Sequence, residues 1–313
     1  MERTTLGSTG IEDSVAGLGC GGYSRLAMAR GGTPEEAQAV VSEALDLGIN
    51  FLDTARAYGT EEVVGKAIAG CRDQVVVSTK TLFRDRDGKY MAPDRLVASL
   101  ERSLERLQTD YVDVYSLHGV TPEHLEACVE HFVPTLQEQV RLGKIRHLGI
   151  TESFMNDPAH DMLRRAIPMG VFDVVMVGFN FLNASARDSV FQPAQEHGVG
   201  TQVMHAVRRA LVDLDALSDT VAKLVAASEI DPAGINAADP VDFLRDPVGV
   251  QTLTEAAYRF CRHEPGVSVV LTGTGSREHL RENTAAINGA VLPAELQQQL
   301  QQVFGRVKTA SGD

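Results

Sequence analysis

Short apolar runs alternate with longer amphipathic segments along most of this chain. Segments with helical periodicity cover 34–47, 61–69, 93–107 and 122–142. Runs with the length and composition of buried strands lie at 15–19, 49–52, 74–79, 112–117, 146–150, 171–177, 199–204 and 268–271. Strands that alternate with helices are typical of α/β proteins with a parallel sheet. A doubly wound sheet uses the same units, but eight strands favour a (β/α)8 TIM barrel.

Turn signals mark two departures from this alternation. Residues 3–14, with two glycines as turn formers, predict an N-terminal β-hairpin. The interval 206–267 between the seventh and eighth strands is far longer than a usual connection. Helices are expected inside it over 212–228 and 251–262. We expect its first part, 206–250, to form a lid or a side wall.

Length, charge and cysteine usage narrow the class of protein. A length of 313 residues suits a single barrel domain, which we expect over 1–313. The 29 Lys and Arg against 42 Asp and Glu give a net charge of −13, which disfavours nucleic acid and anionic membranes. No apolar run approaches the roughly 18 residues of a membrane span. The four cysteines are scattered without a C-x-x-C pair, so neither a disulfide framework nor a metal site is expected. The sequence predicts a cytoplasmic protein, either a monomer or a small homo-oligomer.

Asp53, Tyr58, Lys80 and His118 stand at or just beyond the ends of three successive predicted strands. The carboxyl ends of barrel strands meet at one mouth, so we expect these side chains to lie together. A tyrosine, with a pKa near 10, is a poor proton donor, but a neighbouring ammonium lowers that pKa and a carboxylate keeps the ammonium charged. A histidine can donate a hydrogen bond to a carbonyl oxygen. Alone, each residue has a plain explanation as a solvated or packed side chain. Together they predict a site that protonates a carbonyl.

Three motifs carry a resemblance to the aldo-keto reductase family. They are D-T-A-x-x-Y-G at 53–59, G-K-I-R-x-x-G at 143–149 and a Gly-rich segment followed by Leu, Glu and Asn at 273–283. The resemblance runs over nearly the whole chain. It implies that Asp53, Tyr58, Lys80 and His118 are the catalytic tetrad, with Tyr58 as general acid in reduction and general base in oxidation. Hydride would pass between C4 of a nicotinamide and a small polar carbonyl or alcohol: an aldehyde, a ketone or an aldose.

The resemblance also implies which residues bind the cofactor and the substrate. NADP or NAD is expected, with NADP preferred because Arg277 or Arg281 could hold its extra phosphate. The expected substrate contacts are Tyr23, Phe83, Phe154 and His205. The expected cofactor contacts are Gly21, Gly22, Asp53, Thr151, Glu152, Met204, Gly273, Thr274, Gly275, Arg281, Glu282 and Asn283.

The sequence departs from the family where the nicotinamide would lie. Thr151-Glu152 stands where Ser-Asn is usual, the usual Gln of the sixth strand is replaced within an apolar stretch, and Met204 stands where an aromatic is usual. These departures keep two alternatives open. One is a nucleotide-sensing regulatory barrel without turnover. The other is an enzyme that retains its cofactor as an internal redox relay.

Two further patterns have competing interpretations. Residues 17–22 fit G-x-G-x-x-G, but a dinucleotide fingerprint needs a helix to open there, and the next predicted helix starts only at Pro34. Arg208-Arg209, after the seventh strand, could reach a phosphate or an acidic substrate, or could be a solvated pair.

Overall fold

Eight parallel strands form a closed barrel in the computed structural model, which describes residues 1–236, 238–245 and 249–312. Their order around the ring is β10-β3-β4-β5-β6-β7-β8-β9, so consecutive strands are neighbours. The strands are β3 (Ala16–Gly19), β4 (Phe51–Asp53), β5 (Val76–Thr81), β6 (Val112–Val120), β7 (Ile145–Glu152), β8 (Val174–Gly178), β9 (Gly200–Met204) and β10 (Val269–Thr272). The predicted TIM barrel is confirmed.

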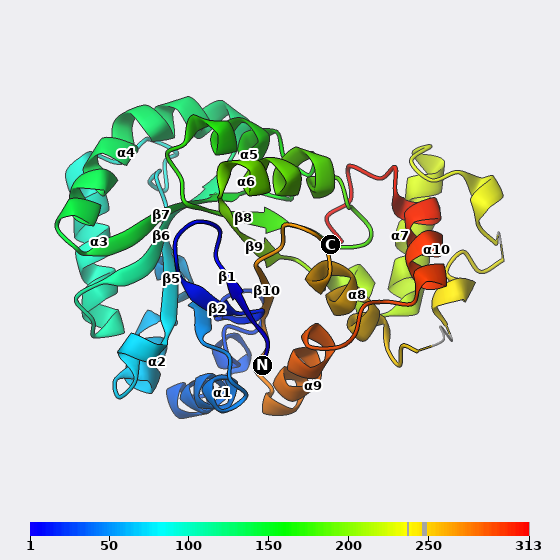
Figure 1. The fold of residues 1–313 in the computed structure, drawn as a ribbon, viewed down its shortest axis with the longest axis horizontal. Coiled ribbons are helices and arrows are strands. Elements are labelled where there is room, and N and C mark those ends of the chain that lie inside the picture. The colour runs from blue at the N-terminus through cyan, green and yellow to red at the C-terminus, as the bar shows by residue number, and fades with distance from the viewer. Residues whose placement is uncertain (237, 246–248, 313) are drawn as a thin grey trace.

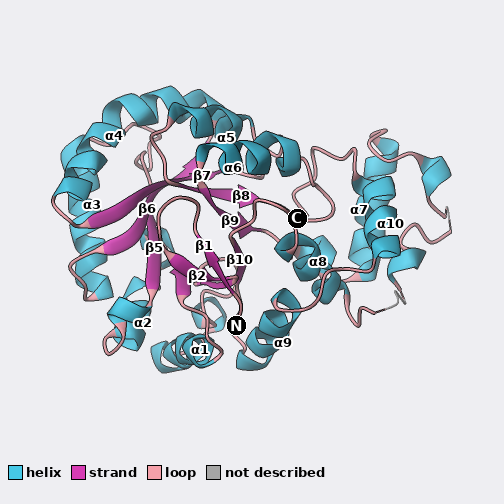
Figure 2. Ribbon diagram, viewed as in Figure 1, coloured by secondary structure: helices cyan, strands magenta, loops and turns pink. Residues whose placement is uncertain are grey.

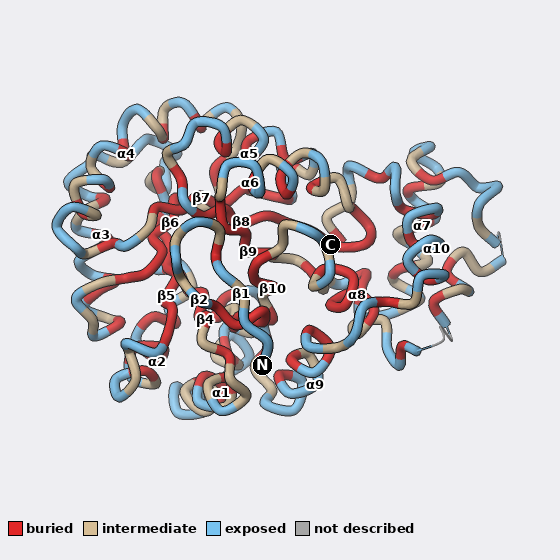
Figure 3. The backbone as a smooth tube through the Cα atoms, in the orientation of Figure 1, coloured by how far each residue is buried: buried red, intermediate tan, exposed pale blue. Residues whose placement is uncertain are grey.

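Most of the helices surround the strands and pack their apolar faces on the outside of the barrel, whereas α7 and α10 lie beside it (Figure 2). In order along the chain they are α1 (Pro34–Asp46), α2 (Glu61–Ile68), α3 (Pro93–Leu107), α4 (Leu125–Arg141), α5 (Asp161–Ala166), α6 (Gln192–His197), α7 (Leu214–Ala226), α8 (Leu253–Arg262), α9 (Arg277–Ile287) and α10 (Ala294–Phe304). Figure 3 shows the strands buried and the outer helix faces exposed. Among the described residues, no helix is both long and apolar enough for a membrane crossing.

Local sequence signals explain where α1 begins and ends. The Thr33 side chain accepts a hydrogen bond from the Glu36 backbone N–H, and the Glu36 carboxylate accepts one from the Thr33 backbone N–H. This reciprocal capping box, with Pro34 in the first turn, fixes the start of the helix. Gly48 follows the helix with a φ of 84°, a conformation that glycine adopts without strain.

The N-terminal hairpin closes one end of the barrel. Its strands β1 (Arg3–Thr5) and β2 (Glu12–Ser14) pair antiparallel, as predicted. Leu6 and Ile11, at the hairpin turn, pack against apolar side chains near the amino ends of the barrel strands. Those side chains are Phe51, Val76, Val114, Val174, Val269 and Leu271. The hairpin therefore forms the floor of the barrel, opposite the carboxyl ends of the strands.

The long interval between β9 and β10 forms a lobe beside the barrel. Its main helix, α7, lies next to α10 (Figures 1 and 2). Phe243 of the lobe packs against Phe304 of α10, with ring centroids 6.5 Å apart. The part of 206–250 that the structure describes from Leu214 onward lies beside the barrel, and its role as a lid or a side wall stays a prediction.

Candidate active site

The four residues of the predicted tetrad come together at the mouth of the barrel. Asp53 ends β4, Lys80 lies near the end of β5, and His118 lies near the end of β6. Tyr58 ends a short 3-10 turn that follows β4. Because β4, β5 and β6 are adjacent in the ring, their carboxyl ends place these side chains within contact distance.

Lys80 is the centre of this cluster and is completely buried. Its Nζ atom donates to Asp53 Oδ2 at 2.7 Å and to the Thr54 carbonyl oxygen at 2.9 Å, and it lies 3.5 Å from the Tyr58 hydroxyl. The second carboxylate oxygen of Asp53 accepts a hydrogen bond from Ser78 Oγ at 3.1 Å. Each donor of the ammonium therefore has an acceptor, which is what a buried charge requires.

Tyr58 lies between Lys80 and His118. Its hydroxyl is 3.4 Å from His118 Nε2, and the two rings meet edge to face with centroids 5.6 Å apart. The cluster thus presents a phenol and an imidazole side by side, with an ammonium behind the phenol.

Burial controls the acidity of the cluster. It raises the pKa of the Tyr58 phenol, and the neighbouring Lys80 offsets this rise only in part, so the net direction is upward. Lys80 lowers this pKa, as the sequence predicts, but the net lowering that the sequence predicts is wrong, because the larger cost of burying a phenolate outweighs it. Burial lowers the pKa of Lys80, but Asp53 and Tyr58 raise it more, so the ammonium stays charged.

His118 is neutral at physiological pH. Burial, followed by the charge of Lys80, lowers the pKa of His118 from 6.5 to about 3. A neutral imidazole carries one N–H, so His118 can donate one hydrogen bond without introducing a second cation beside Lys80. Cys20, also next to the cluster, is buried, and burial followed by the charge of Asp53 raises its pKa, so it is an unreactive thiol.

The turn between β10 and α9 holds the predicted phosphate region. Gly273 is exposed, and Thr274 accepts a hydrogen bond from the Ser276 backbone N–H through its hydroxyl. The Ser276 side chain accepts from the His279 backbone N–H and thereby caps α9. A Gly-rich turn followed by a helix N-terminus offers backbone N–H groups to a phosphate. This turn lies at the same mouth as the tetrad, because β10 pairs with β3 next to β4.

The remaining predicted residues of α9 make contacts within the protein. Asn283 donates to Thr272 Oγ1 at 2.9 Å and so ties α9 to β10. The Arg281 Nε atom donates to Glu43 Oε1 at 2.6 Å, and Arg277 lies 3.8 Å from the other oxygen of Glu43. Glu282 is exposed. Their roles in cofactor binding stay predictions.

Glu152 makes contacts that the sequence did not predict. Its side chain is fully buried; both of its oxygens lie 3.0 Å from His160 Nδ1, and Oε1 also accepts from the Gly178 backbone N–H at 2.7 Å. Burial raises the pKa of Glu152, and His160 opposes this rise. Its neighbour Thr151 accepts a hydrogen bond from the Gly119 backbone N–H. The Glu152 carboxylate is thus engaged beneath the mouth, and its predicted nicotinamide contact stays a prediction. His160, eight residues downstream, was missed because only the tertiary fold pairs it with Glu152.

The four predicted substrate residues separate into different environments. Tyr23 is exposed at the mouth, where the Arg208 guanidinium lies 5.0 Å above its ring. His205 lies just past the end of β9, 5.7 Å from the ring of Phe154. Phe154 is buried and stacks on His160. Phe83 is buried too, but it packs in a separate aromatic cluster against His124 and Tyr90.

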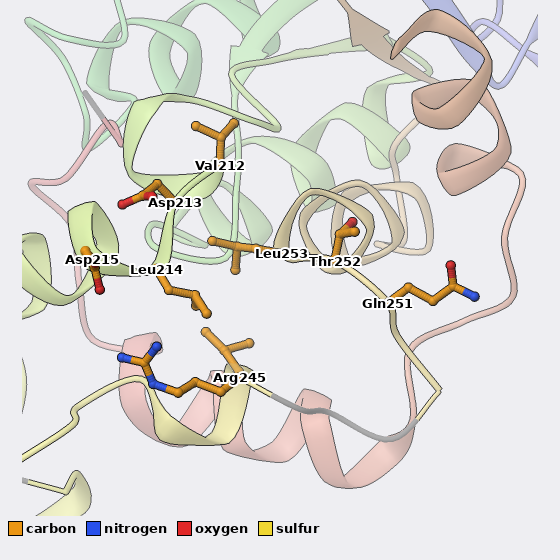
Figure 4. A pocket seen from close by; sticks show the side chains of 9 residues that line it. Val212, Asp213, Leu214, Asp215, Arg245, Gln251, Thr252 and Leu253 are labelled. Carbon is orange, nitrogen blue, oxygen red and sulfur yellow. The ribbon is translucent and has the colours of Figure 1, made fainter. Parts of the chain in front are cut away.

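A hollow of about 400 Å³ lies away from the tetrad, in the lobe beside the barrel. Figure 4 shows side chains from the start of α7 and the start of α8 around this space. The lining residues are Val212, Asp213, Leu214, Asp215, Leu244, Arg245, Gln251, Thr252 and Leu253. None of the predicted catalytic or cofactor residues is among them, so we place the candidate active site at the barrel mouth.

Comparison with known proteins gives relatives that match along most of their length. L-galactose dehydrogenase of Arabidopsis thaliana is 29% identical over 297 residues, covering 92% of this chain and 88% of the relative. NADH-specific methylglyoxal reductase of Escherichia coli is 26% identical over 318 residues, with coverages of 92% and 94%. The holo form of aldo-keto reductase AKR11C1 from Bacillus halodurans superposes with a TM-score of 0.75 at 27% identity, covering 99% of this chain and 97% of that one.

The fold and these relatives define an oxidoreductase of the TIM-barrel class. A model of the Aldo/keto reductase family matches residues 17–304, and the chain belongs to this family. Members of the family use nicotinamide cofactors and act on small-molecule carbonyl compounds.

Proposed function

We propose that this protein transfers hydride between a nicotinamide cofactor and the carbonyl or alcohol of a small polar substrate. The observation that carries the proposal is the contact of the Tyr58 hydroxyl with both Lys80 and His118 at the barrel mouth. Two relatives are named for a sugar and for a small ketoaldehyde, which supports an aldehyde, ketone or aldose as the substrate.

The residues of this chain would divide the proton chemistry among them. The bound nicotinamide supplies or accepts the hydride. Tyr58 gives its proton to the carbonyl oxygen in reduction and takes one from the alcohol in oxidation. Lys80 stabilises the phenolate that is left, and Asp53 holds Lys80 charged and in place. Neutral His118 donates a hydrogen bond to the same oxygen and so orients the carbonyl beside Tyr58.

The mouth has features that fit a nicotinamide dinucleotide. The capped start of α9, after Gly273 and Gly275, suits the phosphates. Gly21 and Gly22 follow β3; Gly21 contacts the Tyr58 ring, and no atom lies within 4 Å of a Cβ position on Gly22, so space is open beside the tetrad there. Arg277 and Arg281 carry the positive charge that a 2′-phosphate needs, which supports NADP over NAD. Glu43 competes for both guanidinium groups, so we expect the preference to be small.

The composition of the chain bears on its location in the cell and on its binding partners. A net charge of −13 and four free cysteines support a cytoplasmic protein that binds neither nucleic acid nor membranes. We infer a monomer or a small homo-oligomer.

A nucleotide-sensing barrel without turnover is the second candidate. It is favoured by the engagement of Glu152 with His160 and Gly178, because this removes one expected contact to the nicotinamide. An enzyme with a retained cofactor would differ from both by carrying nucleotide through purification.

A Tyr58→Phe variant separates these candidates. We expect wild-type protein to oxidise NADPH or NADH with a panel of small aldehydes, ketones and aldoses. Tyr58→Phe should lower kcat by about 100- to 10,000-fold, the usual contribution of a general acid, while nucleotide binding persists. Tyr111→Phe removes a hydroxyl just before β6, at the far end of the barrel, and serves as the control. Unchanged turnover by Tyr58→Phe would refute the mechanism, and tight binding by wild type without turnover of any substrate would favour the sensor.

A further inference from the structure

Asp13 is a carboxyl group enclosed between the N-terminal hairpin and the barrel floor. It belongs to β2 and is completely buried. Because successive side chains of a strand alternate, Asp13 faces the same side as Ile11, which packs on the apolar cluster of the floor. Its cross-strand partner within the hairpin is Thr4. The carboxyl group therefore lies at the interface between the hairpin and the barrel.

This carboxyl group has no hydrogen-bond donor in the part of the chain that the structure describes. Neither Oδ1 nor Oδ2 of Asp13 has a partner there. An unpaired carboxylate in a buried place costs far more free energy than a neutral carboxylic acid, so such a group binds a proton instead. The closed arrangement of hairpin and barrel thus accommodates Asp13 in its protonated form.

The charges around Asp13 favour the same protonated form. Burial, followed by the charge of Asp113 at the start of β6, raises the pKa of Asp13 to about 8. Glu12, the preceding residue of the hairpin, adds to this rise. Arg3 on β1 opposes it without reversing it.

Three basic side chains near the amino ends of the barrel strands have partners of their own. Arg72, just before β5, and Arg146, on β7, bind the two carboxylate oxygens of Asp113 at 2.8 and 2.9 Å. His147 Nδ1 lies 3.6 Å from Asp173 Oδ2, just before β8. These groups are therefore engaged with other carboxylates rather than with the hairpin.

The hairpin is held to the barrel through backbone and amide contacts on either side of Asp13. The Ser14 backbone N–H donates to Asn50 Oδ1 at 2.7 Å, and the Asn50 backbone N–H donates to Ser14 Oγ at 3.0 Å. At the hairpin turn, the Ser8 backbone N–H donates to the Gly198 carbonyl oxygen at 2.7 Å. A short segment attached in this way can separate from a domain without global unfolding. Water reaches the Asp13 carboxyl group only when this interface opens.

We propose that Asp13 is a pH-sensitive switch, in which release of its proton to water accompanies opening of the hairpin from the barrel floor. An aspartic acid in water loses its proton near pH 3.9, whereas in the closed state Asp13 keeps its proton up to about pH 8. Between these values the open state binds fewer protons, so a rise in pH favours opening. The open fraction should rise up to about tenfold per pH unit in this window and level off above pH 8. This inference does not depend on the proposed function.

Amide hydrogen exchange of the full chain measures this opening. The reporters are the backbone N–H groups of Ser8 and Ser14, whose acceptors belong to the barrel, and the amides of β6 serve as the core reference. Protection factors are corrected for the intrinsic exchange rate at each pH. In wild type we expect the protection of Ser8 and Ser14 to fall about 20-fold between pH 6 and pH 7.5, and to stay below that of β6 at both pH values.

Substitutions at residue 13 identify the titrating group. Asp13→Asn keeps the shape of the side chain but cannot ionise, so its hairpin protection should not depend on pH. Asp13→Leu should give the same result and does not place an amide among apolar neighbours. Glu12→Gln removes an exposed acid of the same hairpin and should keep the pH dependence of wild type.

Three results would overturn the proposal. One is hairpin protection in wild type that is the same at pH 6 and pH 7.5. Another is a pH dependence that survives both substitutions at residue 13. The third is equal protection of the hairpin and β6 at both pH values, because the hairpin would then open only by global unfolding.

Discussion

Gly21 and Tyr58 are in such close contact that a Cβ atom on Gly21 would lie 2.5 Å from Cε2 of the tyrosine ring. Gly21 follows β3, and Tyr58 follows β4, the neighbouring strand. The absence of a side chain at residue 21 is therefore what allows the Tyr58 ring to stand beside Lys80 and His118.

A Gly21→Ala substitution should displace the phenol of Tyr58, the proposed general acid, without removing it. Atoms under 3 Å apart cannot both keep their places, so the Tyr58 ring must shift away from its two partners. Because general acid catalysis depends on hydrogen-bond geometry, we expect kcat to fall about 100-fold. Steady-state kinetics with NADPH and an accepted aldehyde measure this. Gly70→Ala adds the same methyl group where no atom lies within 4 Å and should keep wild-type kcat. Equal kcat for both variants would show that the close contact between Gly21 and the Tyr58 ring does not affect turnover.

His118 should make the fold sensitive to acid. Its pKa is about 3 in the folded protein and about 6.5 in the unfolded chain, so below pH 6.5 the unfolded chain binds the extra proton. The free energy of unfolding must therefore fall as the pH falls from 6.5 toward 3. At pH 5 the loss from this residue is about 2 kcal/mol.

Urea denaturation at pH 7.5 and pH 5 measures this effect. The His118→Asn variant should lose about 2 kcal/mol less than wild type between the two pH values, because it lacks this titration. His197→Asn, at an exposed position of α6, should lose as much as wild type. An identical loss of unfolding free energy in all three proteins would contradict the low pKa of His118 in the folded protein.

Glu152 and His160 should be strongly coupled. The pair is fully buried and hydrogen-bonded at 3.0 Å, so a double-mutant cycle with alanine at each position should give a coupling free energy of about 2 kcal/mol. Chemical denaturation of the four proteins supplies the values. The exposed Arg164–Asp161 pair of α5, at 2.8 Å, should give less than about 1 kcal/mol in the same cycle. Similar coupling free energies in the two pairs would mean that burial does not strengthen the interaction between Glu152 and His160.

Glu43 should weaken any preference for NADPH. Its Oε1 atom lies 2.6 Å from Arg281 Nε, and its Oε2 atom lies 3.8 Å from Arg277 Nη1. A carboxylate at this place opposes the approach of a 2′-phosphate. Glu43→Gln should raise the ratio of the NADH Kd to the NADPH Kd roughly fivefold, since exposed ion pairs contribute up to about 1 kcal/mol. Asp46→Asn removes the same charge one turn further along α1 and should leave the ratio unchanged. A lower ratio of the NADH Kd to the NADPH Kd in Glu43→Gln would indicate that the 2′-phosphate binds away from Arg277 and Arg281.

The barrel and its tetrad could be predicted because their signals are local. The run ending at Lys80 is short and apolar, so it could be recognised as a buried strand, and the position of Lys80 at its carboxyl end was enough to direct it to the mouth. The pairing of Glu152 with His160 could not be predicted, because it needs the peptide N–H of Gly178 from another strand and a turn that brings residue 160 back. The packing of Phe83 against His124 was missed for the same reason. The net direction of the Tyr58 pKa depends on burial, which the motif does not encode.

The N-terminal hairpin covers one end of the barrel and leaves the other end, the mouth, open to solvent. Leu6 and Ile11 pack at the end opposite the tetrad, so in the part of the chain that the structure describes, a ligand would approach Lys80 from the mouth. Under the proposed function, the nucleotide and the substrate would share this mouth. The N-terminal hairpin thus confines access to the proposed site to one side, although none of the predicted site residues belongs to it.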